Sequence, residues 1–152
     1  MILLHILWPT FALVLLIFVV TTVLAAQRMR HIKTVAPKRE DFTSNATAAR
    51  YFEPVQLPAD NLANLFETPV LFFAIVPLLM GTQQAGIAQV ALAWIFVLLR
   101  CAHSWIHLSV KNVRARFQVF AASLVVLAAM WVGFFIDFAS AAAVYADAVA
   151  QP

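Results

Sequence analysis

Residues 87–108 read IAQVALAWIFVLLRCAHSWIHL, and this stretch decides the class of the fold. It is long enough to cross the hydrocarbon core of a bilayer, which takes about 20 mostly apolar residues in a helix. It nevertheless carries Arg100, His103 and His107 at the helical spacing i, i+3 and i+7, which places the three side chains on one stripe. Charged groups inside membrane-length helices are costly, and by default they mark a functional site that faces protein rather than lipid.

Three further stretches have the same length and apolar character, at roughly residues 3–26, 61–80 and 117–138. The chain of 152 residues is 64% hydrophobic and only 11% charged, far more apolar than an average soluble domain. A helix satisfies every backbone polar group inside the bilayer. The sequence therefore predicts an all-α integral membrane protein, a bundle of four transmembrane helices that forms a single domain over residues 1–152.

The ten Lys and Arg residues predict the topology. No basic residue precedes the first apolar run, so this run is interpreted as a retained helix rather than a cleaved signal peptide. Six lie in the long polar connection 27–60: Arg28, Arg30, Lys33, Lys38, Arg39 and Arg50. Lys111, Arg114 and Arg116 lie in or beside the third connection, and Arg100 is nearer to the third connection than to the second, so all ten fall on one side. Cytoplasmic loops collect Lys and Arg, which predicts a cytoplasmic loop at 27–60 and both termini outside the cytoplasm. The net charge of +3 then requires no nucleic-acid partner, and the basic rim is expected to meet anionic lipid.

The second apolar run carries a polar stripe of its own, with Asp60, Asn64 and Glu67 at i, i+4 and i+7. Counted from the cytoplasmic side at about 1.5 Å per residue, this stripe reaches the depth of Arg100, and Arg116 opens the fourth helix at the same end. This surplus of hydrogen-bond donors indicates an anionic ligand. The alternative is a buried salt bridge between Glu67 and Arg100 that fixes the helix register.

Pro69 and Pro77 lie in the second apolar run, and each removes a hydrogen-bond donor from its helix. A kink at either proline would widen the space beside Glu67. Membrane helices also tolerate proline more readily than soluble helices do, and the sequence favours neither interpretation.

A metal site is a further possible interpretation, because His103 and His107 have the i, i+4 spacing of paired ligands and Glu67 could be a third. Paired histidines on one helix are more often hydrogen-bonded, however, and Arg100 would repel a cation. The single cysteine, Cys101, excludes an intramolecular disulfide and a cysteine-based zinc cluster. No metal is predicted.

Two separated motifs carry a family resemblance. The segment from Asn64 to Pro69, NLFETP, resembles the Asn-x-x-Glu segment of helix two in MAPEG proteins, the membrane-associated proteins of eicosanoid and glutathione metabolism. Arg100-Cys-Ala-His103, followed by His107 and Arg116, resembles their helix-three and helix-four segment. The resemblance extends over all four helices, and the chain is similar to bacterial members of the family.

The resemblance implies a homotrimer in a bacterial inner membrane, with glutathione bound between subunits near the cytoplasmic face. By this resemblance Asn64 and Glu67 would contact the peptide part of glutathione, and Arg100, His103 and His107 would line the ligand site. Arg116 would stabilise the glutathione thiolate and act as the catalytic residue: a cation close to sulfur favours the thiolate, which is the nucleophile. The implied activity is a glutathione transferase or peroxidase that acts on small lipophilic substrates.

The chain also departs from the family pattern. Asp60 and Ala63 occupy positions where several members have arginines, and His107 replaces a common tyrosine. Phe117 and Phe120 occupy helix-four positions where catalytic members often have Ser or Tyr. Part of the clamp for the glutathione carboxylates is therefore missing. The alternative function is a non-catalytic trimeric membrane protein that binds lipid or partner helices.

Overall fold

The computed structural model describes residues 2–110 and 112–150. Within these residues every regular element is helical. The α-helices are α1 (Leu7–Thr34), α2 (Asn45–Phe52), α3 (Leu57–Glu67), α4 (Pro69–Gly81), α5 (Ile87–Trp105) and α6 (Val113–Ala150). Short 3-10 helices cover η1 (Ile2–Ile6), η2 (Arg39–Phe42) and η3 (Glu53–Val55), and η4 (Ile106–Val110) is a π-helix that continues α5.

Four helical segments of the described chain are long and apolar enough to cross a membrane, which confirms the predicted four-helix fold. They span Leu4–Thr34, Leu57–Gly81, Ile87–Val110 and Val113–Val149. Each is longer than its predicted span, because helices continue past the apolar runs into polar and alanine-rich sequence. The first helix includes the basic residues up to Lys33, and the second begins at Leu57 rather than Asn61.

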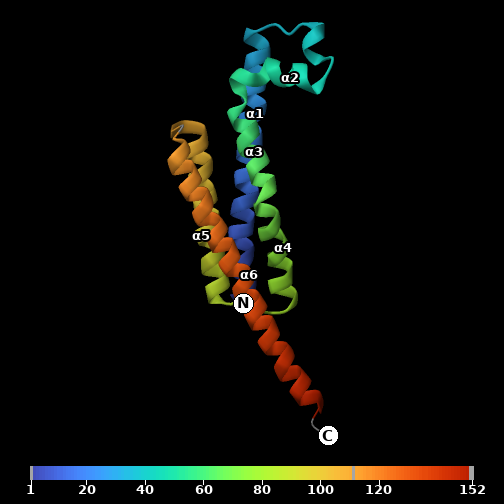
Figure 1. Ribbon diagram of the computed structural model, residues 1–152, viewed down its shortest axis with the longest axis vertical. Helices are drawn as coiled ribbons and strands as arrows, with labels where there is room; N and C mark the ends of the chain where they lie inside the picture. The colour runs from blue at the N-terminus through green and yellow to red at the C-terminus, as the bar shows by residue number, and fades with distance from the viewer. Residues whose placement is uncertain (1, 111, 151–152) are drawn as a thin grey trace.

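The four segments run side by side in an elongated bundle (Figure 1). Helix α1 packs against α3 and α5, and α5 packs along α6. The N-terminus and the α4–α5 connection lie at one end, called here the terminal end, and α6 extends beyond the bundle on this side. Helix α2 and the η4 turn lie at the opposite end, called here the loop end. The basic residue Lys111 of the third connection lies outside the described residues.

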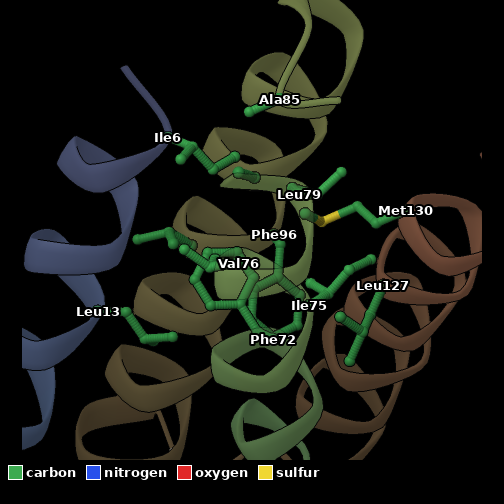
Figure 2. Packing of buried hydrophobic residues seen from close by; sticks show 12 residues of the cluster. Ile6, Leu13, Phe72, Ile75, Val76, Leu79, Ala85, Phe96, Leu127 and Met130 are labelled. Atoms are coloured by element: carbon green, nitrogen blue, oxygen red, sulfur yellow. The ribbon is translucent and has the colours of Figure 1, made fainter. Parts of the chain in front are cut away.

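The hydrophobic core occupies the terminal half of the bundle (Figure 2). The rings of Phe72 from α4 and Phe96 from α5 stack with their centroids 5.1 Å apart and an interplanar angle of 14°. Leu13 from α1 and Met130 from α6 are also fully buried against this pair. The terminal half is thus packed mainly by apolar side chains, with the buried Gln89 amide donating to the Met130 carbonyl at 3.1 Å, and the buried charged residue Arg100 lies in the loop half.

The second span is two helices rather than one, because α3 ends at Glu67 and α4 begins at Pro69. Pro69 has no N–H, so the carbonyl of Leu65 one turn earlier loses its helical donor. Pro77 has no comparable effect, since α4 continues past it to Gly81. Of the two interpretations left open by the sequence, an interruption of the helix holds at Pro69, beside the polar stripe, and simple tolerance of proline holds at Pro77.

The long polar connection is largely ordered. Its first eight residues belong to α1, and the remainder folds as η2, α2 and η3. The Tyr51 hydroxyl donates to the carbonyl of Val35 at the end of α1, and the Tyr51 and Phe52 rings lie 4.9 Å apart. The aromatic side chains therefore hold the connection against the projecting end of α1.

Candidate functional site

Arg100 is the largest fully buried side chain among the described residues, with no exposed surface. Its Nη2 donates to the main-chain oxygen of Asn64 at 2.8 Å, one turn before the break at Thr68. The guanidinium carbon also lies 5.7 Å from the centroid of the Phe120 ring. Arg100 therefore ties α5 to the C-terminal turn of α3. Its side chain is fully enclosed, so its contribution to the site is the position of the helix that it holds.

His103 and His107 lie below the α5–α6 connection, and both are 3% exposed. The His103 Nδ1–H donates to the carbonyl oxygen of Arg116 at 3.3 Å. A carbonyl can only accept, so this bond fixes the tautomer and leaves Nε2 as the acceptor nitrogen. The two imidazoles meet edge to face at 5.9 Å. His107 belongs to the π-helix η4, and π-bulges occur frequently at functional sites.

Two neighbouring cavities open at this level and share Val113 and Arg116. The first, of about 330 Å³, is lined by Leu57, Ile106, His107, Asn112, Val113 and Arg116. The second, of about 200 Å³, is lined by Asn64, His103, Val113, Arg116, Phe117 and Phe120. No Asp or Glu is among the lining residues. Arg116 is thus the accessible cation of a space that carries no opposing charge.

Glu67 is exposed on the subunit surface, in contrast to the enclosed Arg100. Asn64 is half-buried, and its side-chain amide donates to the carbonyl of Asp60 at 2.8 Å within α3. The structure therefore brings Asn64, His103 and Arg116 to one cavity and His107 to the adjoining one. Arg100 holds the main chain of Asn64 from the buried side, and Glu67 lies on the exposed surface of the bundle.

The sequence did not predict the buried hydrogen-bonded pair of Asn61 and Ser104. The Ser104 hydroxyl donates to the Asn61 Oδ1 at 3.2 Å, and Asn61 is fully buried. Asn61 lies three residues before Asn64, so it shares the polar stripe of α3. Its position in that stripe is the signal that could have revealed it. This pair joins α3 to α5 on the loop side of Arg100.

Several buried polar atoms at this level lack a hydrogen-bond partner within the subunit. They are Asn61 Nδ2, Thr68 Oγ1, Arg100 Nε and Nη1, His103 Nε2 and His107 Nδ1. Buried polar groups in folded proteins are nearly always paired, so each such atom calls for a water, a ligand or a partner chain. Two more such atoms, Gln89 Oε1 and Trp131 Nε1, lie beside the apolar core, so most but not all of these atoms belong to the loop half.

Metal chemistry has no supporting cluster in the part of the chain that the structure describes, where no group of three His, Cys, Asp or Glu residues could hold an ion. The two histidines have other surroundings: His103 bonds the main chain of α6, and its ring lies 5.8 Å from that of Phe120. The Arg116 guanidinium is consequently the charged group that both cavities share, and it favours an anion.

Comparison with known proteins agrees with this arrangement. The sequence model of the MAPEG family matches residues 6–136, a range that covers the second and third spans, most of the first and fourth, and every residue of the site. The chain belongs to the MAPEG family. Members of this family include glutathione transferases and related enzymes, and they generally use glutathione as substrate or cofactor. No curated protein and no solved structure gives a significant match to this MAPEG chain.

Proposed function

We propose that this MAPEG protein binds glutathione at its loop end and acts as a glutathione transferase or peroxidase on small lipophilic substrates. The observation that carries the proposal is Arg116, which lines both cavities of a site whose lining has no acidic residue. The larger cavity, of about 330 Å³, is within the range of about 300–1,000 Å³ that is typical of small-molecule sites. The unpaired buried donors nearby suit an anionic, polar ligand.

Bound glutathione supplies a thiol whose deprotonated form is the nucleophile. The guanidinium of Arg116 favours this form, since a fixed cation near the sulfur stabilises the negative charge and lowers the thiol pKa. His103 holds the start of α6 through the carbonyl of Arg116, and His107 forms the wall of the larger cavity. These contacts keep the cation at the cavity and limit its motion.

The remaining site residues act on the peptide part of glutathione. Asn64 lines the smaller cavity, and Arg100 orients it by bonding its main-chain oxygen. Glu67 lies on the outside of the subunit, where a neighbouring subunit could complete the site with it. This placement supports a homotrimer with ligands between subunits. Asp60 and Ala63 provide no cation for the glutathione carboxylates, so we expect weaker binding than in members that have arginines there.

The proposed setting is a bacterial inner membrane, with residues 1–152 as a single domain. The loop end carries the basic residues and would face the cytoplasm. Both termini lie at the terminal end (Figure 1) and would face the outside. Lipophilic substrates would reach the exposed Phe117 directly from the bilayer.

A glutathione titration of the purified protein tests the proposal. Binding is measured by calorimetry and thiolate formation by ultraviolet absorbance, with turnover of an electrophile followed in parallel. We expect saturable binding, and we expect Arg116→Ala to lose most of the thiolate signal. Arg114→Ala is the matched control, because Arg114 is an exposed arginine on the same helix that lines neither cavity. An Arg116→Ala protein with unchanged thiolate formation and turnover would refute the assigned role.

The second candidate function is a non-catalytic trimeric membrane protein, in which the polar layer serves assembly. Phe117 favours it, because this side chain is 68% exposed at the smaller cavity, where catalytic relatives often have a polar residue. This candidate predicts that Glu67→Gln or Arg100→Gln dissociates the trimer in native mass spectrometry. Intact mutant trimers would count against it.

A further inference from the structure

A third cavity lies away from the proposed glutathione site, between the projecting end of α1 and η3. Its volume is about 330 Å³, and its lining consists of Gln27, Arg30, His31, Thr34 and Val55. The four α1 residues have the spacing i, i+3, i+4 and i+7, so they form one stripe that faces Val55 across the cavity. No acidic side chain is part of the lining.

The depth of this cavity matches the headgroup layer of a membrane. The apolar run of α1 ends at Ala26, and Gln27 to Thr34 rise about 10 Å beyond it. The polar layers add about 5–8 Å to each side of the hydrocarbon core. The stripe therefore begins where lipid chains end and phosphate groups lie.

The hydrogen bonds around the cavity leave a defined set of free donors. The His31 Nε2–H donates to the carbonyl of Tyr51 at 2.9 Å, and the Thr34 hydroxyl donates to main-chain oxygens of its own helix at 3.0 and 3.1 Å. These two side chains thus shape the wall. The other two polar lining residues, Arg30 and Gln27, have side-chain N–H groups available for a ligand, and a guanidinium fork matches phosphate oxygens well.

The opposite wall is fixed by the same aromatic group that orders the connection. The Arg28 guanidinium lies over the Phe52 ring at 4.8 Å. Arg28 is thus packed against an aromatic ring, and Arg30 is the Lys or Arg side chain that lines the cavity. Phe52 and Val55 belong to consecutive helical turns, α2 and η3. The cavity is therefore bounded by ordered structure on both sides.

We propose that this cavity binds the phosphate group of an anionic phospholipid, with Arg30 as its principal ligand and Gln27 as a second donor. The position at the headgroup depth, the single accessible cation and the absence of acidic lining residues favour a membrane phosphate over a soluble anion. The site is separate from Arg116 and does not depend on glutathione binding. Each subunit carries one such site at its loop end.

Lipid retention measured by native mass spectrometry tests this proposal. The purified protein is mixed in detergent with equal amounts of phosphatidylglycerol and phosphatidylcholine. The detergent is then removed inside the mass spectrometer, and the lipid that stays bound is counted. Wild type is expected to retain phosphatidylglycerol preferentially, and Arg30→Gln should retain about fivefold less of it. Lys33→Gln is the matched control. It removes the same charge three residues further along α1, and the Lys33 side chain does not line the cavity. Arg30→Lys should keep most of the preference, because the charge remains.

Three results would overturn the proposal. One is equal retention of the two lipids by wild type, and another is an equal loss in Arg30→Gln and Lys33→Gln, which would indicate diffuse surface charge. The third is displacement of phosphatidylglycerol by millimolar inorganic phosphate, which would assign the cavity to a free anion. Circular dichroism of each variant verifies that it is folded, and Gln27→Leu provides a second test that leaves every charge in place.

Discussion

Replacing Arg100 by methionine tests how the buried guanidinium contributes to stability. The substitution removes the 2.8 Å bond to the Asn64 carbonyl, which costs about 1.5–3 kcal/mol for a charged donor. It also removes two buried donors, Nε and Nη1, that have no partner within the subunit. Each unpaired donor costs about 1–3 kcal/mol, so their removal returns about 2–6 kcal/mol. Because Arg100 has no exposed surface, solvent screening does not reduce these values.

The net change of the unliganded Arg100→Met protein is therefore expected to lie between a loss of about 1 kcal/mol and a gain of about 4.5 kcal/mol, in line with other buried charges replaced by apolar residues. Its glutathione affinity should nevertheless fall, since Asn64 is no longer held. Stability is measured by reversible unfolding in mixed micelles, with Arg114→Met as an exposed control expected to change by less than about 0.5 kcal/mol. A loss greater than about 2 kcal/mol would refute the reasoning and would mean that both donors are paired in the assembled protein.

Two further substitutions probe the packing of α6 and the anchor of the polar connection. A methyl group added by Gly133→Ala would lie 3.1 Å from the Gln89 Nε2, which donates to the Met130 carbonyl at 3.1 Å, so we expect a loss of about 1 kcal/mol from displacement of this hydrogen bond. Gly81→Ala, which meets nothing within 4 Å, is the control, and equal melting temperatures for both would contradict the expectation. Tyr51→Phe should increase proteolysis of residues 35–52. Burial of the hydroxyl and the nearby Asp41 carboxylate raise the pKa of Tyr51 above its usual value of 10.0, so wild-type protection should persist through neutral pH and decline only above pH 10; a decline near neutral pH would argue against this anchor.

The fold was accessible from the sequence because membrane helices are recognised by length and hydrophobicity alone. The four spans were predicted in number and order, and the structure confirms them. Their ends were not predicted, since helices continue through polar residues such as Lys33 and alanine-rich sequence after Phe138. Hydropathy indicates the length of the apolar run, whereas the end of a helix depends on its backbone hydrogen bonds, which can continue through polar residues.

The candidate site was accessible in part. Helical spacing placed Arg100, His103 and His107 on one stripe, and all three are buried in the structure. Spacing could not show that Arg100 would be enclosed and Glu67 exposed, because two stripes at equal depth can face each other or face different neighbours. Which of these occurs depends on the rotation of each helix about its axis, and the packing of the complete bundle sets that rotation.

The break at Thr68 gives the second span a mechanical property. Main-chain hydrogen bonding is interrupted between α3 and α4, so bending there requires little energy compared with bending an intact helix. The stacked Phe72 and Phe96 pair anchors α4, while Arg100 holds α3 on the other side of the joint. The loop half of this span is consequently joined to α5 by polar contacts and the terminal half by aromatic packing, so the joint at Thr68 divides one span into two parts that are held by different kinds of interaction.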